Sequence, residues 1–587
     1  MAETLISPGV LARENDQSFI GSRPVTFGAA ILGPAVKGPV NIPTAVSSFS
    51  QYEAIFGGAL ESGSQFYTYL NSIAARNYFA NGGESLLVTR VVTGSFTAAS
   101  TSGSLAGGNG SGIIALGFAD AADSAYQKTS FQLSTISEGE IMNSSGSLNS
   151  AGSLVSGSSD NLRWEIPTVN TSSGQFSLLI RRGNDITNEK AVLETYNNLS
   201  LDPTAPNYIS KVIGDSRFTV RQDGTDFYVQ QSGSFANRSA YVYVSAVNTP
   251  TPDYFNNDGS IKDALTGSLP QVGSGSFTGA TGKNIEDGNA FFGVDITTTN
   301  IQGVNPDDYT SSIDLLSNKD DYQFNVISAP GLNNTQHSTA TTKLVTLAQG
   351  RTDCIAVIDL VAYGANIGDV VTQAAGFDSS YAATYWPWLQ TLDANTGQIV
   401  WAPASTYIPG VYAFTDASAD PWFAPAGLIR GALGSVIRAE RKLTSGNRDT
   451  LYEANVNPIA TFPGSGVVVF GQKTLQKRAS ALDRVNVRRL LIALKSFIVQ
   501  VSDNLVFEQN TNATRNAFLA EVNPYLESVQ QRQGLFAFKV VMDASNNTPD
   551  VIDRNELVGQ IFLQPTKTAE FIILDFNVLP TGATFPE

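Results

Sequence analysis

The chain has 587 residues, 42% of them hydrophobic, and a formal net charge of -16. This length can bury several hydrophobic cores and predicts roughly three or four domains. The acidic balance disfavours general binding to nucleic acid or anionic membranes, because proteins that bind these usually carry a broad basic field. The opening segment MAETLISPGVLARENDQ lacks the features of a signal peptide, and no run approaches the roughly 20 apolar residues of a membrane span. We therefore expect a soluble protein made in a cytoplasm.

The single cysteine and the single histidine exclude several classes of site. Disulfides within the chain, zinc sites built from Cys and His, and catalytic arrangements with two histidines are all impossible. Cys354 lies in the apolar run CIAVIDL, which favours an inert buried thiol over a nucleophile. His337 lies in NNTQHSTA, which we interpret as a polar loop without a nearby carboxylate, so a catalytic triad is not expected. The sequence predicts no catalytic residue, cofactor or bound metal.

The first part of the chain predicts an arm followed by an α/β unit. Residues 1–22 hold too few apolar residues for a core, which indicates an extended arm. A buried strand then runs from Val25 into Gly-Pro turns, and Ser47 or Ser48 can cap a short helix in SFSQYEAIFGG. A second helix is predicted from Ser64 to Ala80, before the strand SLLVTRVV. Residues 23–93 are thus predicted as a β-α-α-β unit, the first part of a body.

Residues 94–304 differ in composition, since they are rich in Ser, Gly, Thr and Asn. The patterns FSLLIRR, SRFTVRQ, TDFYVQQS and YVYVSAV predict strands, and NEKAVLETYNNL is predicted as one helical piece. The α/β pattern resumes after this region. We therefore interpret it as one or two β-rich modules inserted into the α/β body.

The body resumes at Asn305, which can cap a helix in PDDYTSSIDLLSNK. The strand QFNVISAPG, a helix around Thr341 to Gln349 and the strand CIAVIDLV follow, an alternation that favours a sheet with some parallel pairing. Asp393 to Gly397 predicts a hairpin turn. The fold class is therefore a mixed α/β multidomain protein, with residues 305–566 as the second part of the body.

The end of the chain combines helices with strands. A helix is expected from Asn512 to Gly534, with Pro524 marking a start or a kink. The segments LFAFKVVMD, LVGQIFLQP and AEFIILDFNVL predict strands. Residues 567–587 are interpreted as a second extended arm.

The longest clean helical periodicity lies between Arg484 and Asn510. Its apolar residues recur at three- and four-residue spacing and predict one buried stripe: Val487, Leu490, Leu494, Ile498, Val501 and Leu505. Arg484, Arg488 and Lys495 fall within roughly 40° of one another beside this stripe. From Arg430 to Lys495 there are 12 basic and 4 acidic residues. A solvated basic edge, a surface for an acidic partner and a nucleic-acid groove all remain open, although interleaved aromatics for base stacking are lacking.

Several segments, in the same order, resemble the contractile tail sheath proteins of myophages, and more distantly the sheaths of pyocins and type VI secretion systems. In the first half they are SPGV, AAILGPAVKGPVNIP, FGG and LETYNNLSLDPTAPNYISKVIGD. In the second half they are ISAPG, YAATYWPWL, ASTYIPGVYAFTD, WFAPAGL, TFPGSGVVVFGQKTL, VNVRRLLIALK, VFEQN and AEFIILDFNV. Most of residues 94–304 carries no such segment.

The resemblance implies a structural subunit and not an enzyme. Subunits of this family polymerise as stacked six-membered rings around a tail tube, and contraction drives the tube through the host envelope. The implied partners are further copies of the chain, the tail tube protein, and baseplate and tail-terminator or neck proteins, with no specific nucleic acid and no direct membrane insertion. The implied location is the virion, after assembly in the host bacterial cytoplasm. The inserted region is expected on the outside, and the helix from Arg484 in the inner domain.

The two arms are candidates for strand exchange between subunits. If each arm pairs with the sheet edge of a neighbour, backbone hydrogen bonds link subunits while flexible joints let the bodies rotate. The candidate arm residues are Ser7, Pro8, Gly9, Val10, Leu11, Phe571, Ile572, Ile573, Leu574 and Phe576. Arg484, Arg488 and Lys495 are candidates for gripping an acidic tube. A tail-fibre or adhesin-type binding protein would explain the β-rich region but not the α/β body, and a carboxylate-dependent hydrolase has no supporting motif.

Overall fold

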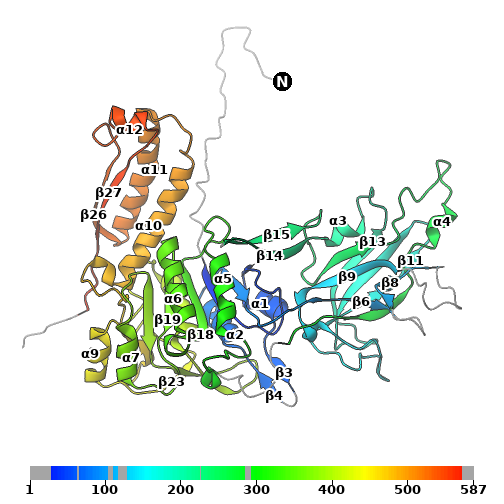
Figure 1. Ribbon diagram of the computed structural model, residues 1–587, viewed down its shortest axis with the longest axis horizontal. Coiled ribbons are helices and arrows are strands. Elements are labelled where there is room, and N and C mark those ends of the chain that lie inside the picture. Colours follow the sequence, from blue (N-terminus) through cyan, green and yellow to red (C-terminus); the bar gives the residue numbers. More distant parts are fainter. Residues whose placement is uncertain are drawn as a thin grey trace, which may run out of the picture.

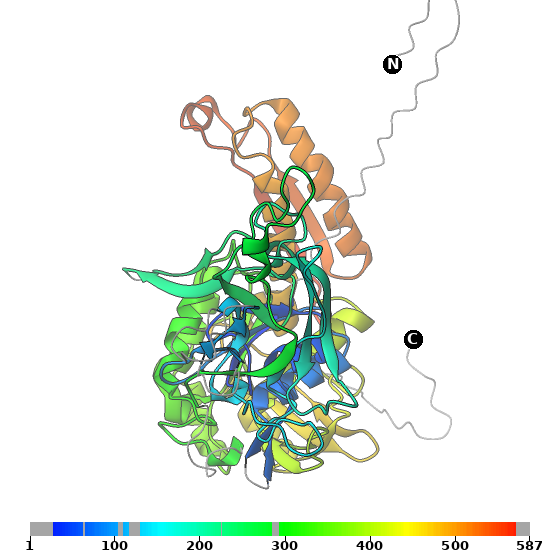
Figure 2. The ribbon, with the colours of Figure 1, turned by 90° about the vertical axis from the view of Figure 1, so that its right-hand side faces the viewer.

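The computed structural model describes residues 28–62, 65–103, 110–116, 129–224, 226–283 and 293–570 (Figure 1). Three hydrophobic clusters divide this part of the chain. We call its three parts the body (28–93 and 293–484), the β domain (94–283) and the C-terminal unit (485–566). The β domain extends from one side of the body, and Figure 2 shows the C-terminal unit projecting from the top of the body.

An eight-stranded sheet forms the centre of the body, in the order β2-β5-β1-β18-β19-β20-β24-β25. The strands from β5 to β24 in this order are parallel, which confirms the expected parallel pairing, while β2 and β25 are antiparallel to their neighbours. The strands are β1 (Ala29–Gly33), β2 (Thr44–Val46), β5 (Leu86–Arg90), β18 (Val326–Asn333), β19 (Ile355–Asp359), β20 (Ala382–Trp386), β24 (Asn457–Phe462) and β25 (Gly466–Val469).

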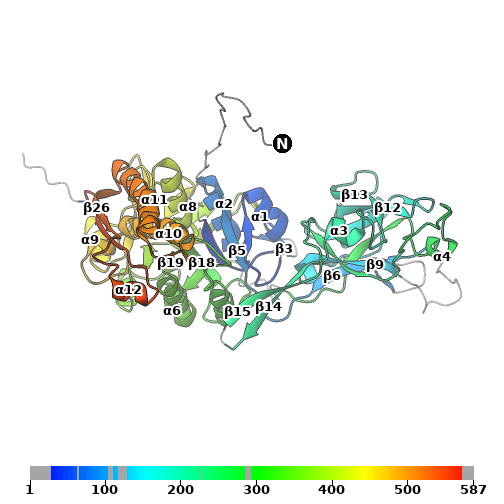
Figure 3. The same ribbon diagram turned by 90° about the horizontal axis from the view of Figure 1, so that it is seen from above.

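Helices cover both faces of this sheet, which is why β1, β18, β19 and β20 are buried along their whole length. Figure 3 shows α6 on one side of the sheet and α2 and α8 on the other. The body helices are α1 (Phe49–Phe56), α2 (Leu70–Ala80), α5 (Tyr309–Leu315), α6 (Asn334–Arg351), α7 (Ile367–Ala374), α8 (Ile408–Ser418) and α9 (Ser445–Glu453).

Local signals account for several element ends in the body. Ser48 accepts a hydrogen bond from the Gln51 amide at the start of α1, and Asn305 accepts one from Asp307, as expected for N-caps. A small sheet of β21 (Leu389–Leu392), β22 (Ile399–Ala402) and β23 (Val436–Ala439) lies beside the main sheet. The turn from Asp393 to Gly397 joins β21 to β22, and the Gly397 amide donates to the Asp393 carbonyl over 2.8 Å. The predicted hairpin turn is therefore confirmed.

The predicted helix from Ser64 to Ala80 was wrong in its first turns. The helix begins only at Leu70, and the hairpin of β3 (Leu60–Ser62) and β4 (Gln65–Tyr67) precedes it. The spacing of Tyr67 and Leu70 fits a helix, but Phe66 and Tyr67 each pair with a residue of the opposite strand of the hairpin instead. Aromatic residues favour strands where such a partner is present.

The β domain is built on a ten-stranded antiparallel sheet with the main order β11-β12-β10-β17-β6-β9-β16. Its strands are β6 (Ala98–Gly103), β7 (Gly110–Ser111), β8 (Ile113–Ile114), β9 (Thr129–Glu138), β10 (Leu162–Ile166), β11 (Val169–Asn170), β12 (Gln175–Arg182), β13 (Val192–Ser200), β16 (Val242–Val247) and β17 (Gly273–Thr278). Two short helices, α3 (Ile209–Ile213) and α4 (Asp263–Thr266), complete it.

The helix predicted in NEKAVLETYNNL is absent, because Val192–Ser200 forms strand β13. This strand pairs antiparallel with β12, and its Leu199 is fully buried in the core of the β domain. Ala, Leu, Glu and Lys favour helices only weakly, so pairing with a neighbouring strand overrides their preference. The other strands expected in this region are confirmed.

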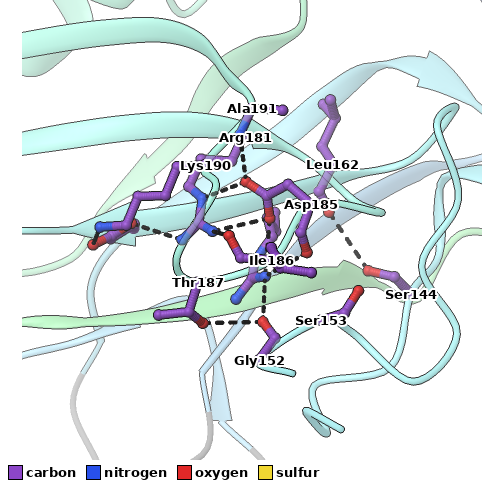
Figure 4. A network of polar contacts seen from close by, with 12 residues as sticks. Ser144, Gly152, Ser153, Leu162, Arg181, Asp185, Ile186, Thr187, Lys190 and Ala191 are labelled. Atoms are coloured by element: carbon purple, nitrogen blue, oxygen red, sulfur yellow. Dashed lines mark hydrogen bonds and ion pairs between the residues drawn. The ribbon is translucent and has the colours of Figure 1, made fainter. Parts of the chain in front are cut away.

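A buried ionic network stabilises one end of the β domain (Figure 4). The Asp185 carboxylate accepts hydrogen bonds from Arg163 over 3.0 Å and from Nε of Arg181 over 2.7 Å. Arg181 also donates to Glu165 over 2.7 Å, and Glu165 pairs with Lys190. Both arginine side chains are 1% exposed. The network therefore holds the turn between β12 and β13 against β10, with the buried carboxylate fully paired.

The two segments that connect the β domain to the body lie side by side at a place that we call the neck. The Thr97 amide donates to the Thr281 carbonyl over 3.0 Å, and the Thr281 amide donates to Oγ1 of Thr97 over 2.8 Å. The chain thus enters and leaves the β domain at the same place. The hairpin of β14 (Arg217–Asp223) and β15 (Asp226–Ser232) also reaches back toward the body and contacts α5 (Figure 1).

The C-terminal unit has a hydrophobic cluster of its own, and the assignment of residues 305–566 to one part of the body stays a prediction. It comprises α10 (Val485–Asp503), α11 (Asn512–Gln531), β26 (Leu535–Val541), α12 (Pro549–Asp553) and β27 (Gln560–Pro565). The apolar stripe of α10 is confirmed, because Leu490, Leu494 and Val501 are buried against α11 and the hairpin. Pro524 lies inside the continuous helix α11.

Candidate functional site

The carboxyl end of the body sheet is filled by the chain itself. In open α/β sheets, ligands bind where neighbouring strands connect in opposite directions, as β1 and β18 do here. The 3₁₀ turn η4 (Ala404–Thr406) contacts the ends of β18, β19 and β20 at this place. The amide and hydroxyl of Ser405 both donate to the Asp359 carboxylate. The carboxyl ends of β18, β19 and β20 are therefore covered by η4.

The buried titratable groups of the body have structural partners. Burial raises the pKa of Asp359 to about 7, and the hydrogen bonds from Ser405 oppose this shift. His337 lies in α6 and not in the loop expected from the sequence; its Nδ1 accepts from the Asn333 amide, and its Nε2 contacts the Thr297 carbonyl at 2.8 Å. Burial also lowers the pKa of His337. Cys354 is buried as expected, and burial raises the pKa of its thiol. Within the ranges that the structure describes, no group of three or more His, Cys, Asp or Glu residues could hold a metal ion.

The three basic residues singled out on α10 have different environments. Arg488 is only 4% exposed, and its guanidinium lies 4.0 Å from the centroid of the Tyr381 ring. Lys495 is exposed, with its Nζ 3.4 Å from the Tyr381 hydroxyl. Arg484 precedes the first turn and pairs with Asp483 and Glu570. Of the readings left open by the sequence, the solvated basic edge does not fit Arg488, which packs against the body; the tube-gripping role of the three residues stays a prediction.

Other basic residues of the segment from Arg430 to Lys495 do face solvent. The exposed ones besides Lys495 are Arg438, Arg441, Lys442, Lys477 and Arg478. They lie on the body, in segments before α10. The sequence shows an excess of basic over acidic residues in these segments but not which surface carries it. These residues are accessible to solvent, whereas Arg488 and Arg489 of α10 are buried.

The joint between body and C-terminal unit rests on ion pairs that the sequence did not reveal. Arg489 is 4% exposed, pairs with Asp416 of α8 over 2.5 Å, and lies 4.6 Å from the Tyr412 ring centroid. Burial raises the pKa of Asp416, and the Arg489 charge opposes this shift. Arg532 pairs with Asp420 over 2.7 Å at the more exposed side of the same joint. The consecutive arginines Arg488 and Arg489, between apolar residues, gave no sign that both would be buried.

The C-terminal unit leaves a short sheet open. Within the described part of the chain, β26 and β27 pair only with each other, so the outer edge of each strand has no strand partner. Phe536 and Phe562 on this hairpin are 76% and 57% exposed. Phe507, in the connection between α10 and α11, is fully exposed. Unpaired backbone groups and exposed aromatic side chains together are typical of a surface that another chain covers.

The candidate arm residues cannot be placed. Ser7 to Leu11 and Phe571 to Phe576 lie outside the described residues, so their strand exchange stays a prediction. The segment just before the second arm is described and lies against the body, where Glu570 contacts Arg484, Tyr452 and Gln472. In the described ranges, every helix is too short or too polar for a bilayer crossing.

Comparisons with known proteins place the second half of the chain. Residues 302–475 match the phage tail sheath protein central domain, and residues 478–579 match the phage tail sheath C-terminal domain. The tail sheath protein of Vibrio phage KVP40 is 38% identical over 220 residues, which cover 38% of this chain and 33% of that protein. The tail sheath protein of Enterobacteria phage T4 is 33% identical over 267 residues, which cover 43% of this chain and 40% of that protein. Each match spans less than half of the relative's length.

The fold extends further than the sequence similarity. The crystal structure of a sheath tail protein from Listeria innocua has a TM-score of 0.51 with this structure, covers 92% of this chain and 95% of that chain, and is 11% identical. At this identity the likeness concerns the mixed α/β fold alone. Taken with the two domain matches, it supports the expected fold class. Residues 302–475 and 478–579 of this chain are thus similar to two domains of phage tail sheath proteins.

Proposed function

We propose that the protein is a structural subunit of a contractile phage tail sheath, assembled as stacked six-membered rings around a tail tube. The observation that carries this proposal is the open hairpin β26–β27, which lies inside the segment that matches the tail sheath C-terminal domain. A rigid body joined to an open sheet edge suits a subunit that must stay linked while it moves. Contraction would drive the tube through the host envelope.

Strand exchange supplies the links between subunits in this proposal. An arm from one subunit, residues 1–22 or 567–587, adds to the edge of β26 or β27 in the next subunit through backbone hydrogen bonds. Contacts of this kind run head-to-tail, from the arm of one copy to the edge of another, so they can link subunits within a ring and link successive rings into a helical stack. The exposed rings of Phe536 and Phe562 would be covered in the assembly, which adds apolar burial to the backbone hydrogen bonds.

The tail tube, the baseplate and the neck proteins are the further partners in this proposal, and the virion is the place of function after assembly in the host cytoplasm. Exposed basic residues of the body, with Lys495 of α10, are proposed to face an acidic tube before contraction. Lys495→Glu should weaken co-assembly with the tube and leave tube-free polymers unchanged. Unchanged co-assembly would assign Lys495 to ordinary solvation.

Electron microscopy of the purified protein tests the proposal directly. The full chain should form hollow striated tubes, and a chain lacking residues 1–22 should remain folded but form none. Circular dichroism of the truncated chain checks that its fold is kept. Monodisperse full-length subunits under all conditions, or tubes of normal length from the truncated chain, would contradict strand exchange.

A further inference from the structure

Two of the last four described residues, Thr568 and Glu570, are bound to the body by hydrogen bonds. The Glu570 carboxylate accepts from Nε of Arg484 over 2.8 Å, from the Tyr452 hydroxyl over 2.7 Å and from Nε2 of Gln472 over 3.0 Å. These three donors come from three separate segments: the start of α10, the end of α9 and the connection after β25. A single carboxylate therefore gathers three parts of the chain.

The pocket that receives Glu570 is shaped by residues that are themselves held in place. Gln472 is 3% exposed, and its Nε2 also donates to Oγ1 of Thr568 over 2.6 Å. The ammonium of Lys473 lies 4.4 Å from the centroid of the Tyr452 ring and donates to the Tyr452 carbonyl over 2.7 Å. Because these donors are fixed by the body, residues 568–570 adopt a position set by the body.

The electrostatics agree with this geometry. Burial raises the pKa of Glu570, but the hydrogen bonds from Arg484, Tyr452 and Gln472 outweigh it, so the pKa lies below the ordinary value. The Glu570 side chain is 18% exposed, and that of Arg484 is 24% exposed. Glu570 is thus ionised at neutral pH and partly shielded from solvent, where charge-assisted hydrogen bonds are strong.

The same contact closes the C-terminal unit at its base. Arg484 directly precedes α10, where the chain enters the unit, and Glu570 follows β27, where the chain leaves it. The amide of Thr566 still donates to the Gly534 carbonyl of the C-terminal unit, whereas Thr568 and Glu570 bind the body. The chain therefore passes from one part to the other between 566 and 568.

We propose that Arg484, Tyr452 and Gln472 form a clamp that fixes Glu570 as the root of the C-terminal inter-subunit arm. This inference rests on the proposed function, and it assigns Arg484 a role different from gripping the tube. With Glu570 held, the arm starts from the body at a fixed point, and a pull on the arm acts on the body instead of opening the hairpin β26–β27. The clamp residues thus act on assembly indirectly, by holding Glu570 in position.

Tryptic cleavage at Lys567 tests the clamp in the isolated subunit. Lys567 is exposed but lies in the clamped segment, so cleavage requires the segment to detach. Glu570→Ala should speed this cleavage at least tenfold. The charge exchange Arg484→Glu with Glu570→Arg should restore part of the protection, which a purely steric role of Glu570 would not allow. Equal cleavage of the full chain and Glu570→Ala would overturn the clamp.

A matched control comes from another ion pair of the C-terminal unit. Asp550→Asn removes the exposed pair between Arg554 and Asp550, whose side chains are 54% and 81% exposed. Its cleavage at Lys567 and its tube formation should equal those of the unaltered chain. The same result in Glu570→Ala would show that loss of any carboxylate is tolerated and would overturn the proposal.

Tube formation distinguishes a failure of the clamp proposal from a failure of the proposed sheath function. Glu570→Ala should need at least tenfold more protein than the unaltered chain to form tubes, as counted by electron microscopy, while its thermal unfolding midpoint for the body stays the same. Normal assembly of a variant that is cleaved rapidly would overturn the assignment of Glu570 as the arm root and leave the sheath function intact. An unaltered chain that forms no tubes would contradict the sheath function and the arm together.

Discussion

The sheet of the body and the hairpin of the C-terminal unit differ in how their edges are finished. At the edge strand β25, the Val469 amide donates to the Gly431 carbonyl over 2.8 Å, and the Leu433 amide donates to the Val467 carbonyl over 3.0 Å. The hairpin β26–β27 has no such cover in the described residues. A covered edge resists pairing with other chains, and an open edge invites it. The closed sheet and the open sheet edge that can pair with another chain therefore lie in different parts of the molecule.

The burial of the strands shows the same contrast. Every residue of β18 and β19 is buried, whereas exposed and half-buried residues alternate along β27. The hydrophobic core of the body is thus buried without a neighbouring subunit. The C-terminal unit buries one face of its hairpin on α11 and leaves the other to solvent, so its stability should increase when another subunit covers it.

The largest effect should come from the core of the C-terminal unit. Leu526→Ala removes a fully buried side chain between α11 and the hairpin and should destabilise this unit by about 2–5 kcal/mol. Hydrogen exchange should then accelerate in α10, α11 and β26 but not in β18 or β19. Equal acceleration in the body would show that both parts unfold as one unit. Ile552→Ala, at a partly exposed position of α12, serves as control.

The joint between the two parts should respond next. Asp416→Asn leaves the buried Arg489 guanidinium without its charged partner, and we expect a loss of about 2–3 kcal/mol because breaking a buried pair leaves an uncompensated charge. The thermal unfolding midpoint measures this loss. Asp420→Asn breaks the more exposed pair with Arg532 at the same joint and should cost less than about 1 kcal/mol. Equal losses from both substitutions would argue against a buried joint.

A pH dependence should come from Asp359 in the body. Its folded pKa of about 7 lies above the ordinary value of 3.8, so the folded state holds a proton that the unfolded state releases. The stabilisation of the folded state by this proton is fully present below about pH 4. It is lost as pH rises through 7, and the free energy of unfolding falls by about 2 kcal/mol between pH 5 and 7. Asp359→Asn should flatten the decline of the unfolding midpoint over this range. Parallel pH profiles of variant and unaltered chain would show that Asp359 does not titrate there.

The smallest effect should come from an exposed pair of the C-terminal unit. Asp550→Asn removes the contact with Arg554 and should change the free energy of unfolding by less than about 0.5 kcal/mol. Urea denaturation with matched protein concentrations can detect a larger change. A loss above about 1 kcal/mol would mean that this surface is less exposed to solvent in solution than the structure indicates.

Sequence patterns predicted those features that depend on neighbours along the chain. The cap at Ser48, the cap at Asn305 and the stripe of α10 each need only a few consecutive residues, and each is present. The alternation of helices and strands likewise predicted a sheet with parallel strands. The domain matches then gave independent support for the sheath resemblance.

The errors concern features that distant parts of the chain decide. Strand β13 forms because β12 offers a partner, and Arg488 is buried because Tyr381 lies beside α10. Glu570 is a comparable case, since its three donors lie 86 to 118 residues away in the chain. No local pattern contains such information, so a basic residue beside an apolar stripe is read equally well as solvated or as buried.

The neck at Thr97 and Thr281 has a consequence for how such a protein can be altered. A segment that starts and ends at one point can be lengthened, shortened or exchanged without changing the strand order of the body. The entropy of closing the intervening loop grows only slowly with its length, by about 0.6 kcal/mol for each doubling. The two threonines thus mark a natural grafting point, where a foreign domain could replace the β domain and, in the proposed sheath, be displayed in many regularly spaced copies.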